Sequence, residues 1–145
     1  MGYTGNGKTY CVECGRTLVN PINVMQRIVG GSEAFKSSWP YHVLIVQSFR
    51  GKYRIKDSFY SINYSWSCGG TIINQKTVLT AAHCVHDKSF DYQDGDDYYN
   101  LSIEWNEWYP NLESTFSVYA GAHDTRYLNH TKRLRVKRII KVIIY

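Results

Sequence analysis

Apolar and β-branched residues recur along most of the chain in short runs that are separated by polar turns. The clearest runs cover residues 39–46, 67–73 and 77–80, and a short polar turn at 74–76 joins the last two. Runs of this length and composition are typical of strands, and no stretch of the chain shows a convincing helical period. The pattern therefore predicts an all-β protein.

The segment between the first two runs is longer than a tight hairpin needs. Residues 50–57 are rich in charge, whereas residues 59–66 are aromatic and polar. We therefore expect residues 50–66 to form a hairpin with extended tips.

A second long segment, residues 85–115, has no clear period and is acidic and aromatic. Hard cations such as Ca²⁺ bind several carboxylates, so a calcium loop is one interpretation. The spacing does not match the EF-hand pattern, because Gly95 follows directly on Asp94 and the preceding acid is Asp91. With Asp96 and Asp97 completing the cluster, the favoured interpretation is a solvated surface loop.

The bases gather near the end of the sequence. Six of the seventeen lie between Lys132 and Lys141, within a net charge of +5. Residues 133–137 alternate basic and apolar side chains, which is typical of a strand with one solvated face, and residues 139–145 predict another strand. Because no aromatic interleaving or nucleic-acid motif accompanies the charge, the sequence does not predict nucleic-acid binding.

Length and composition indicate the class of protein. A chain of 145 residues corresponds to about one domain, and no apolar run is long enough to span a bilayer. The four cysteines and three N-x-[ST] sequons, at Asn63, Asn100 and Asn129, favour a secreted, disulfide-bonded glycoprotein. Residues 1–10 do not resemble a secretory leader, so we expect the natural leader to be missing or replaced.

Two motifs carry the candidate chemistry. Residues 80–84 read Thr-Ala-Ala-His-Cys directly after a predicted strand, and residues 27–31 read Arg-Ile-Val-Gly-Gly some fifty residues upstream. Histidine suits a general base because its pKa lies near neutral pH. Together the two motifs resemble the chymotrypsin/trypsin family of serine proteases.

The resemblance implies a fold and a set of site residues. The fold is an antiparallel six-stranded barrel, the first of the family's two barrels. His83 takes the position of the catalytic base, and a disulfide between Cys68 and Cys84 holds its turn. Residues 1–27 correspond to a pro-segment, which cleavage between Arg27 and Ile28 separates from a peptidase region, residues 28–145.

The resemblance also implies the partners. These are protein or peptide substrates, a protease that cleaves at Arg27, and protease inhibitors, with no cofactor or metal in the reaction. In this family the catalytic groups occur in the order histidine, aspartate, serine. Asp124 follows His83 but lacks the apolar run that accompanies the family's aspartate, and no Gly-Asp-Ser-Gly-Gly motif occurs. We therefore expect an N-terminal fragment of a serine endopeptidase that is inactive alone.

Two other functions stay open from the sequence. One is a protease-like domain without catalysis that binds or regulates a partner. The other is a zinc module built on Cys11, Cys14, His83 and Cys84, since a C-x-x-C pair can supply zinc ligands. Against the zinc site, the family resemblance favours a disulfide between one pro-segment cysteine and the second half of the protease.

Overall fold

The computed structural model describes residues 33–86, 89–103, 109–140 and 142, together with two short strands near the N-terminus. These two strands, β1 (Gly2–Tyr3) and β2 (Thr9–Tyr10), pair antiparallel with each other. The motifs at Arg27–Ile28 and at Cys11 and Cys14 lie outside the described residues. Among the helices that the structure does describe, none is long and apolar enough to cross a membrane.

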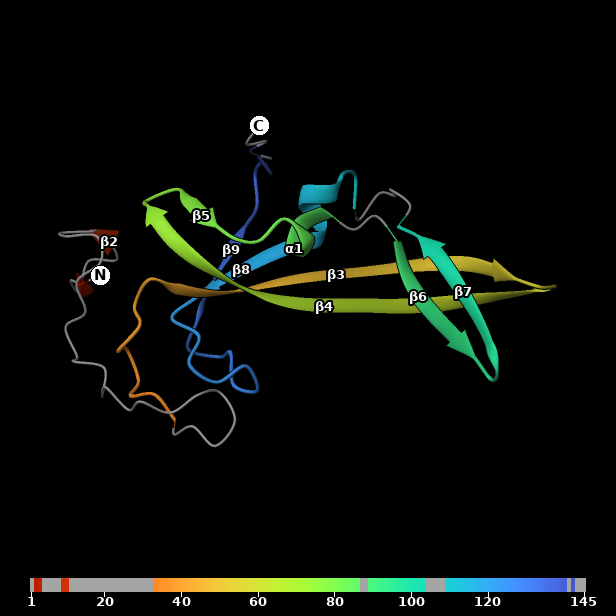
Figure 1. Cartoon of the computed structure of the whole chain (residues 1–145), viewed down its shortest axis with the longest axis horizontal. Helices are drawn as coiled ribbons and strands as arrows, with labels where there is room; N and C mark the ends of the chain where they lie inside the picture. Colours follow the sequence, from red (N-terminus) through yellow and green to blue (C-terminus); the bar gives the residue numbers. More distant parts are fainter. Residues whose placement is uncertain are drawn as a thin grey trace.

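One long hairpin dominates the fold (Figure 1). Strand β3 (His42–Ile55) has 14 residues and β4 (Ser58–Asn74) has 17, against a typical strand length of about 5–6. They pair continuously from His42↔Thr71 to Ile55↔Ser58. The expected hairpin with extended tips is therefore confirmed, and the runs at 39–46 and 67–73 form the base of the same two strands.

The hairpin is the centre of a curled five-stranded sheet (Figure 1). The strand order is β5–β4–β3–β8–β9, and every neighbouring pair is antiparallel. The outer strands are β5 (Thr77–Leu79), β8 (Phe116–Ala120) and β9 (Lys132–Arg135). The all-β, antiparallel prediction is confirmed.

The C-terminal strands are shorter than the sequence predicted. Strand β9 ends at Arg135 rather than continuing to residue 137, and the described residues among 139–145 belong to no strand. Arg135 pairs with Ser117, and β8 has only one more residue, Phe116, before it gives way to the 3₁₀ helix η1 (Leu112–Thr115). Beyond the position opposite Phe116, β8 therefore offers no backbone with which the chain after Arg135 could extend the ladder.

The interior of the curled sheet holds one apolar cluster. Its buried members are Val43, Ile45, Phe116 and Val118, which lie on adjacent strands. Gly70 on β4 lies so close to this cluster that an added Cβ would stand 2.9 Å from Ile45 Cδ1 and 2.8 Å from Val78 Cγ1. Strand β5 can therefore pack directly on the cluster only because residue 70 has no side chain.

A second hairpin contradicts the predicted surface loop at 85–115. Strands β6 (Ser89–Asp94) and β7 (Asp97–Ser102) pair antiparallel, with a two-residue turn at Gly95–Asp96. Gly95 has φ +64°, the conformation that a two-residue hairpin with glycine in its first central position requires. The face that carries Phe90, Tyr92, Tyr99 and Leu101 is apolar and needs a surface to cover it, although Asp94 and Asp97 stand at its turn end.

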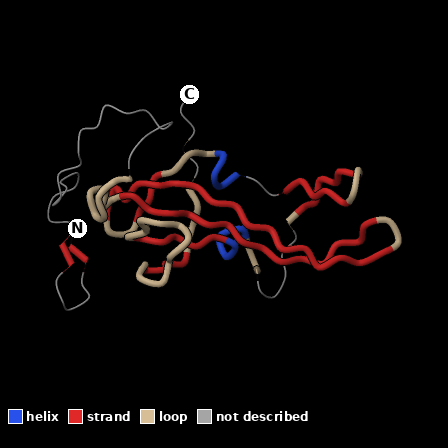
Figure 2. Tube along the Cα trace, turned by 90° about the horizontal axis from the view of Figure 1, so that it is seen from below, coloured by secondary structure: helices blue, strands red, loops and turns tan. Residues whose placement is uncertain are grey.

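The far half of the β3–β4 hairpin provides that surface (Figures 1 and 2). A second apolar cluster forms there, and its buried members are Phe49, Tyr53, Ile55, Ile62, Phe90 and Ile103. The Phe90 ring lies 5.7 Å from that of Tyr53 in an edge contact and 4.7 Å from that of Tyr64 in a stacked one. We call this part of the molecule, β6–β7 with residues 49–64 of the β3–β4 hairpin, the distal lobe.

Candidate active-site histidine and its setting

His83 lies at the start of the short helix α1 (His83–His86), four residues after strand β5 ends. The turn before it is fixed by the Thr80 hydroxyl, which donates a 2.7 Å hydrogen bond to the carbonyl of Gly69 on β4. The amide of Cys84 donates to the carbonyl of Ala81 at 3.1 Å. The His83 side chain is exposed, so a folded turn presents its imidazole to solvent.

A disulfide fastens this turn to the sheet. Cys84 is 5 % exposed and is bonded to Cys68 on β4, with the two Cα atoms 5.9 Å apart. The pairing that the family resemblance implied is therefore present in the structure. A ring nitrogen of His83 lies within 4.8 Å of both sulfurs, so the imidazole sits beside the bond that holds its own turn.

The same contact bears on the zinc interpretation. His83, Cys68 and Cys84 are the one group of three metal-ligand residue types that converge within the described part of the chain. A cysteine binds zinc as its thiolate. The sulfurs of Cys68 and Cys84 are bonded to each other and so are not thiolates. The disulfide thus takes Cys84 out of the proposed zinc set, while Cys11 and Cys14 fall outside the described residues.

Asp124, the aspartate nearest after His83 in the sequence, has another partner. Its carboxylate accepts hydrogen bonds from Arg126, with Nε 2.9 Å from Oδ1 and Nη2 2.7 Å from Oδ2. The side-chain hydrogen bonds are the largest cause, and a hydrogen bond from the Arg126 backbone amide is the next. Together they lower the pKa of Asp124 from 3.8 to about 2. Within the residues that the structure describes, the His83 imidazole has no hydrogen-bond partner, so Asp124 does not orient it.

The other histidines differ from His83 in their settings. His123 Nε2 lies 2.8 Å from the Glu33 carboxylate, and no pattern in the sequence predicts this interaction between residues 90 positions apart. His42 and His130 are exposed, and the His86 side chain lies outside the described residues.

The three sequon asparagines are all exposed. Asn63 on β4 accepts a 2.7 Å hydrogen bond from Arg50 Nε through its side-chain oxygen. Asn100 on β7 donates from its side-chain nitrogen to Asp91 at 2.9 Å. Asn129 lies in the loop between β8 and β9. Exposure at all three positions leaves room for a glycan.

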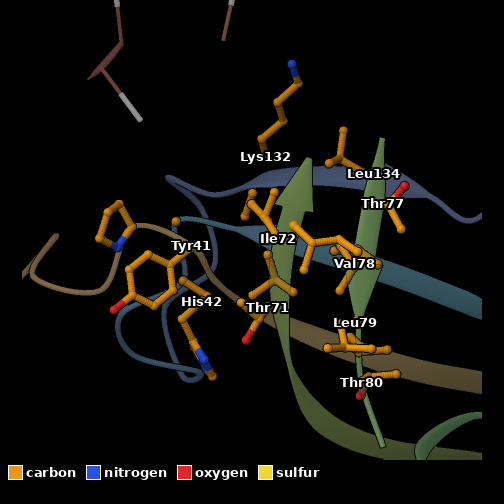
Figure 3. Close-up of a pocket in the computed structure, with 18 of the residues that line it drawn as sticks. Tyr41, His42, Thr71, Ile72, Thr77, Val78, Leu79, Thr80, Lys132 and Leu134 are labelled. Carbon is orange, nitrogen blue, oxygen red and sulfur yellow. The ribbon is translucent and has the colours of Figure 1, made fainter. Parts of the chain in front are cut away.

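A broad groove of about 2000 Å³ opens beside the interior cluster. Figure 3 shows Ile72, Val78 and Leu79 from β4 and β5 on one part of its wall and Lys132 and Leu134 from β9 on another. His83 is not among its lining residues. The groove lies between the two edge strands, β5 and β9, on the open side of the curled sheet.

The comparisons with known proteins bear directly on this arrangement. A profile of the trypsin family matches residues 28–143. The chain belongs to the chymotrypsin/trypsin family of serine proteases. The match covers the whole five-stranded sheet, the disulfide-bonded turn and the distal lobe.

Individual members of the family show the same relationship. The chain is 36 % identical to chymotrypsin-C of Rattus norvegicus over 97 residues, which are 67 % of this chain and 32 % of that protein. It is 43 % identical to chymotrypsin-like elastase family member 1 of Homo sapiens over 77 residues, 52 % of this chain and 25 % of that one. The chain spans about a third or less of these relatives. No solved structure matches it significantly.

Proposed function

We propose that this chain is the N-terminal part of a secreted serine endopeptidase zymogen and that His83 is its general base. The observation that carries the proposal is the setting of His83 in a chain of this family. The imidazole is exposed on a turn that a disulfide and the Thr80 hydrogen bond fix to the sheet. A base that must meet a serine from another segment benefits from such a rigid support.

The proposed reaction is peptide-bond hydrolysis through an acyl-enzyme. His83 accepts the proton of the serine hydroxyl as it attacks the carbonyl, and then donates that proton to the leaving amine. An aspartate orients the imidazole and stabilises its charged form, and backbone amides bind the oxyanion. No Gly-Asp-Ser-Gly-Gly motif occurs in the sequence and Asp124 is paired with Arg126, so the chain alone is proposed not to turn over peptides.

Activation is proposed to occur by cleavage between Arg27 and Ile28. The activating enzyme is a protease that cuts after arginine, and the new amine of Ile28 would pair with an aspartate beside the nucleophilic serine. Residues 1–27 act as the pro-segment. The proposed partners also include inhibitors that bind the mature enzyme. Glycans are proposed at Asn63, Asn100 and Asn129.

The complete barrel is proposed to have six strands. Strands β5 and β9 flank the groove and have no further strand partner among the described residues, so one more strand pairing with them would close the groove and cover the exposed Leu79 and Leu134. Removing apolar surface and open strand edges from water favours this closure.

The test is made on the product of the full coding region, purified with and without cleavage at Arg27. Cleaved protein should hydrolyse a chromogenic peptide and react with a fluorophosphonate at one serine. His83→Ala should lower kcat by about 10⁴-fold or more, as loss of a triad member does in related mechanisms. The matched control, His130→Ala, should retain full activity. A full-length product that is cleaved and folded but inert in both assays would favour the non-catalytic binding protein instead.

A further inference from the structure

Four basic side chains occur along the end of strand β3 and in the turn that follows it. Arg50, Lys52, Arg54 and Lys56 occupy every second position of the hairpin arm and its turn, and all four are exposed. The alternate positions, which include Tyr53 and Ile55, are buried on the opposite face. The period of two places Arg50, Lys52 and Arg54 on one face of the sheet, and Lys56 lies in the turn that follows the strand. We call these four residues the basic stripe.

The neighbouring strand adds no acid to this face. Across the ladder, Arg50 faces Asn63, Lys52 faces Ser61 and Arg54 faces Phe59, and all three partners are uncharged. The Phe59 side chain is 76 % exposed and lies at the far end of the stripe. The face is therefore basic and polar with one apolar group at its tip.

Two acids reach the end of the stripe. Asp57 lies 3.7 Å from Arg54, and both side chains are largely exposed. Asp97 of the β6–β7 turn bonds to Lys56, and their hydrogen bond raises the pKa of Lys56 and lowers that of Asp97. Exposed pairs of this kind contribute little stability and exchange easily.

The other two cations have no acid to neutralise them. Among the described residues, Arg50 bonds only to the neutral side chain of Asn63, and Lys52 has no ion-pair partner. The β6–β7 hairpin packs on the opposite, aromatic face. Within the described part of the chain, the acidic residues therefore leave Arg50 and Lys52 of the basic stripe without a neutralising partner.

We propose that the basic stripe binds an extended, acidic segment of another protein. Side chains on one face of a strand repeat about every 6.8 Å, so the three strand cations, Arg50, Lys52 and Arg54, span about 14 Å. An extended polypeptide with an acid at every second position has the same repeat, so its carboxylates can meet successive cations. Exposed Phe59 offers such a segment an apolar contact at the end of the stripe.

The stripe also has a defined relation to His83. Strand β4 runs from Asn63, opposite Arg50, to Cys68, a rise of about 17 Å. Cys68 is bonded to Cys84, the residue next to His83. If the proposed peptidase function holds, a protein held by the stripe has neighbouring segments within reach of that histidine; the binding itself does not depend on catalysis.

The test uses the 145-residue chain and fluorescein-labelled peptides, with anisotropy as the readout. The probe is a ten-residue peptide of alternating glutamate and serine, and its control has glutamine in place of glutamate. Lys52→Gln with Arg54→Gln should weaken binding of the acidic probe at least tenfold. The matched control, Lys36→Gln with Lys76→Gln, removes the same charge at other exposed positions and should change affinity less than twofold. Raising the salt concentration should weaken binding in the wild type.

Several results would overturn the proposal. Equal losses of affinity in the two double variants would show that the peptide is attracted to the net charge of the protein and not to the basic stripe. Equal binding of a peptide with its glutamates in one block would refute the extended occupant. A sulfated oligosaccharide that binds the stripe when the acidic peptide does not would assign the surface to a glycan instead. Because none of these outcomes requires peptidase activity, they are separable from failure of the proposed enzymatic function.

Discussion

The Cys68–Cys84 disulfide offers the sharpest test of how the His83 turn is held. We expect Cys68→Ala with Cys84→Ala to preserve the fold but lower the free energy of unfolding. The bond closes a loop with a sequence separation of 16, and constraining such a loop in the unfolded chain is worth about 3 kcal/mol in the chain-entropy model. Alanine also removes a buried sulfur at position 84, which adds to the loss.

The measurement is urea unfolding followed by tryptophan fluorescence. Both the disulfide-bonded protein and the double-alanine variant carry Cys11→Ser and Cys14→Ser, so that the other two cysteines do not contribute. With a urea dependence of about 1–3 kcal/mol per molar, a loss of 3 kcal/mol lowers the midpoint by roughly 1–3 M. Reducing agent should lower the midpoint of the first protein and leave that of the second unchanged.

Two results would refute the reasoning. Equal midpoints would mean that the strand pairing and the Thr80 hydrogen bond hold the turn without the covalent bond. A midpoint in the double-alanine variant that still falls with reducing agent would mean that the effect arises elsewhere in the chain.

Three further predictions follow from particular contacts. Phe90→Ala should destabilise the protein by about 3–5 kcal/mol in the same assay, because Phe90 is buried between two rings, whereas exposed Phe59→Ala should have little effect. Gly70→Ala should cost about 1–3 kcal/mol in thermal or urea unfolding, because its Cβ would overlap side chains of the interior cluster. The Asp124 carboxyl should titrate with a pKa of about 2 by carbon-detected NMR, returning toward 3.8 in Arg126→Gln. Because this folded pKa is depressed, its contribution to stability is present above about pH 4 and is lost as pH falls toward 2; an unchanged pKa in the variant would remove Arg126 as the cause.

The sequence predicted the sheet better than it predicted the loops. Short apolar and β-branched runs and the polar turn at 74–76 were enough to locate β3, β4 and β5, because strands are rich in such residues. The β6–β7 hairpin was missed, although Gly95–Asp96 is a recognised two-residue turn signal with Tyr92 and Tyr99 paired on either side of it. Four acids fall among residues 91–97, so the segment resembled a loop until the aromatic surface that covers its apolar face was known.

The end of β9 could not be predicted locally at all. Residues 139–145 are rich in isoleucine and favour a strand, yet strand length depends on a neighbour, and β8 has almost no residues left to pair beyond Arg135. The same limit applies to the site. The disulfide and the proposed role of His83 came from family resemblance, while the Asp124–Arg126 and Glu33–His123 interactions depend on loop conformations that carry no signal in the sequence.

Strand β4 connects the features that matter for the proposed function. Its far half packs against Phe90 of β6, its middle carries Cys68, and Gly70 allows β5 to approach. The segment with His83 leaves β5, is bonded to Cys68, and leads within a few residues into β6, which returns to the same hairpin. The segments before and after His83 in the sequence are therefore both attached to β4. A partner bound on the basic stripe would contact the hairpin that supports the proposed base, without touching the histidine itself.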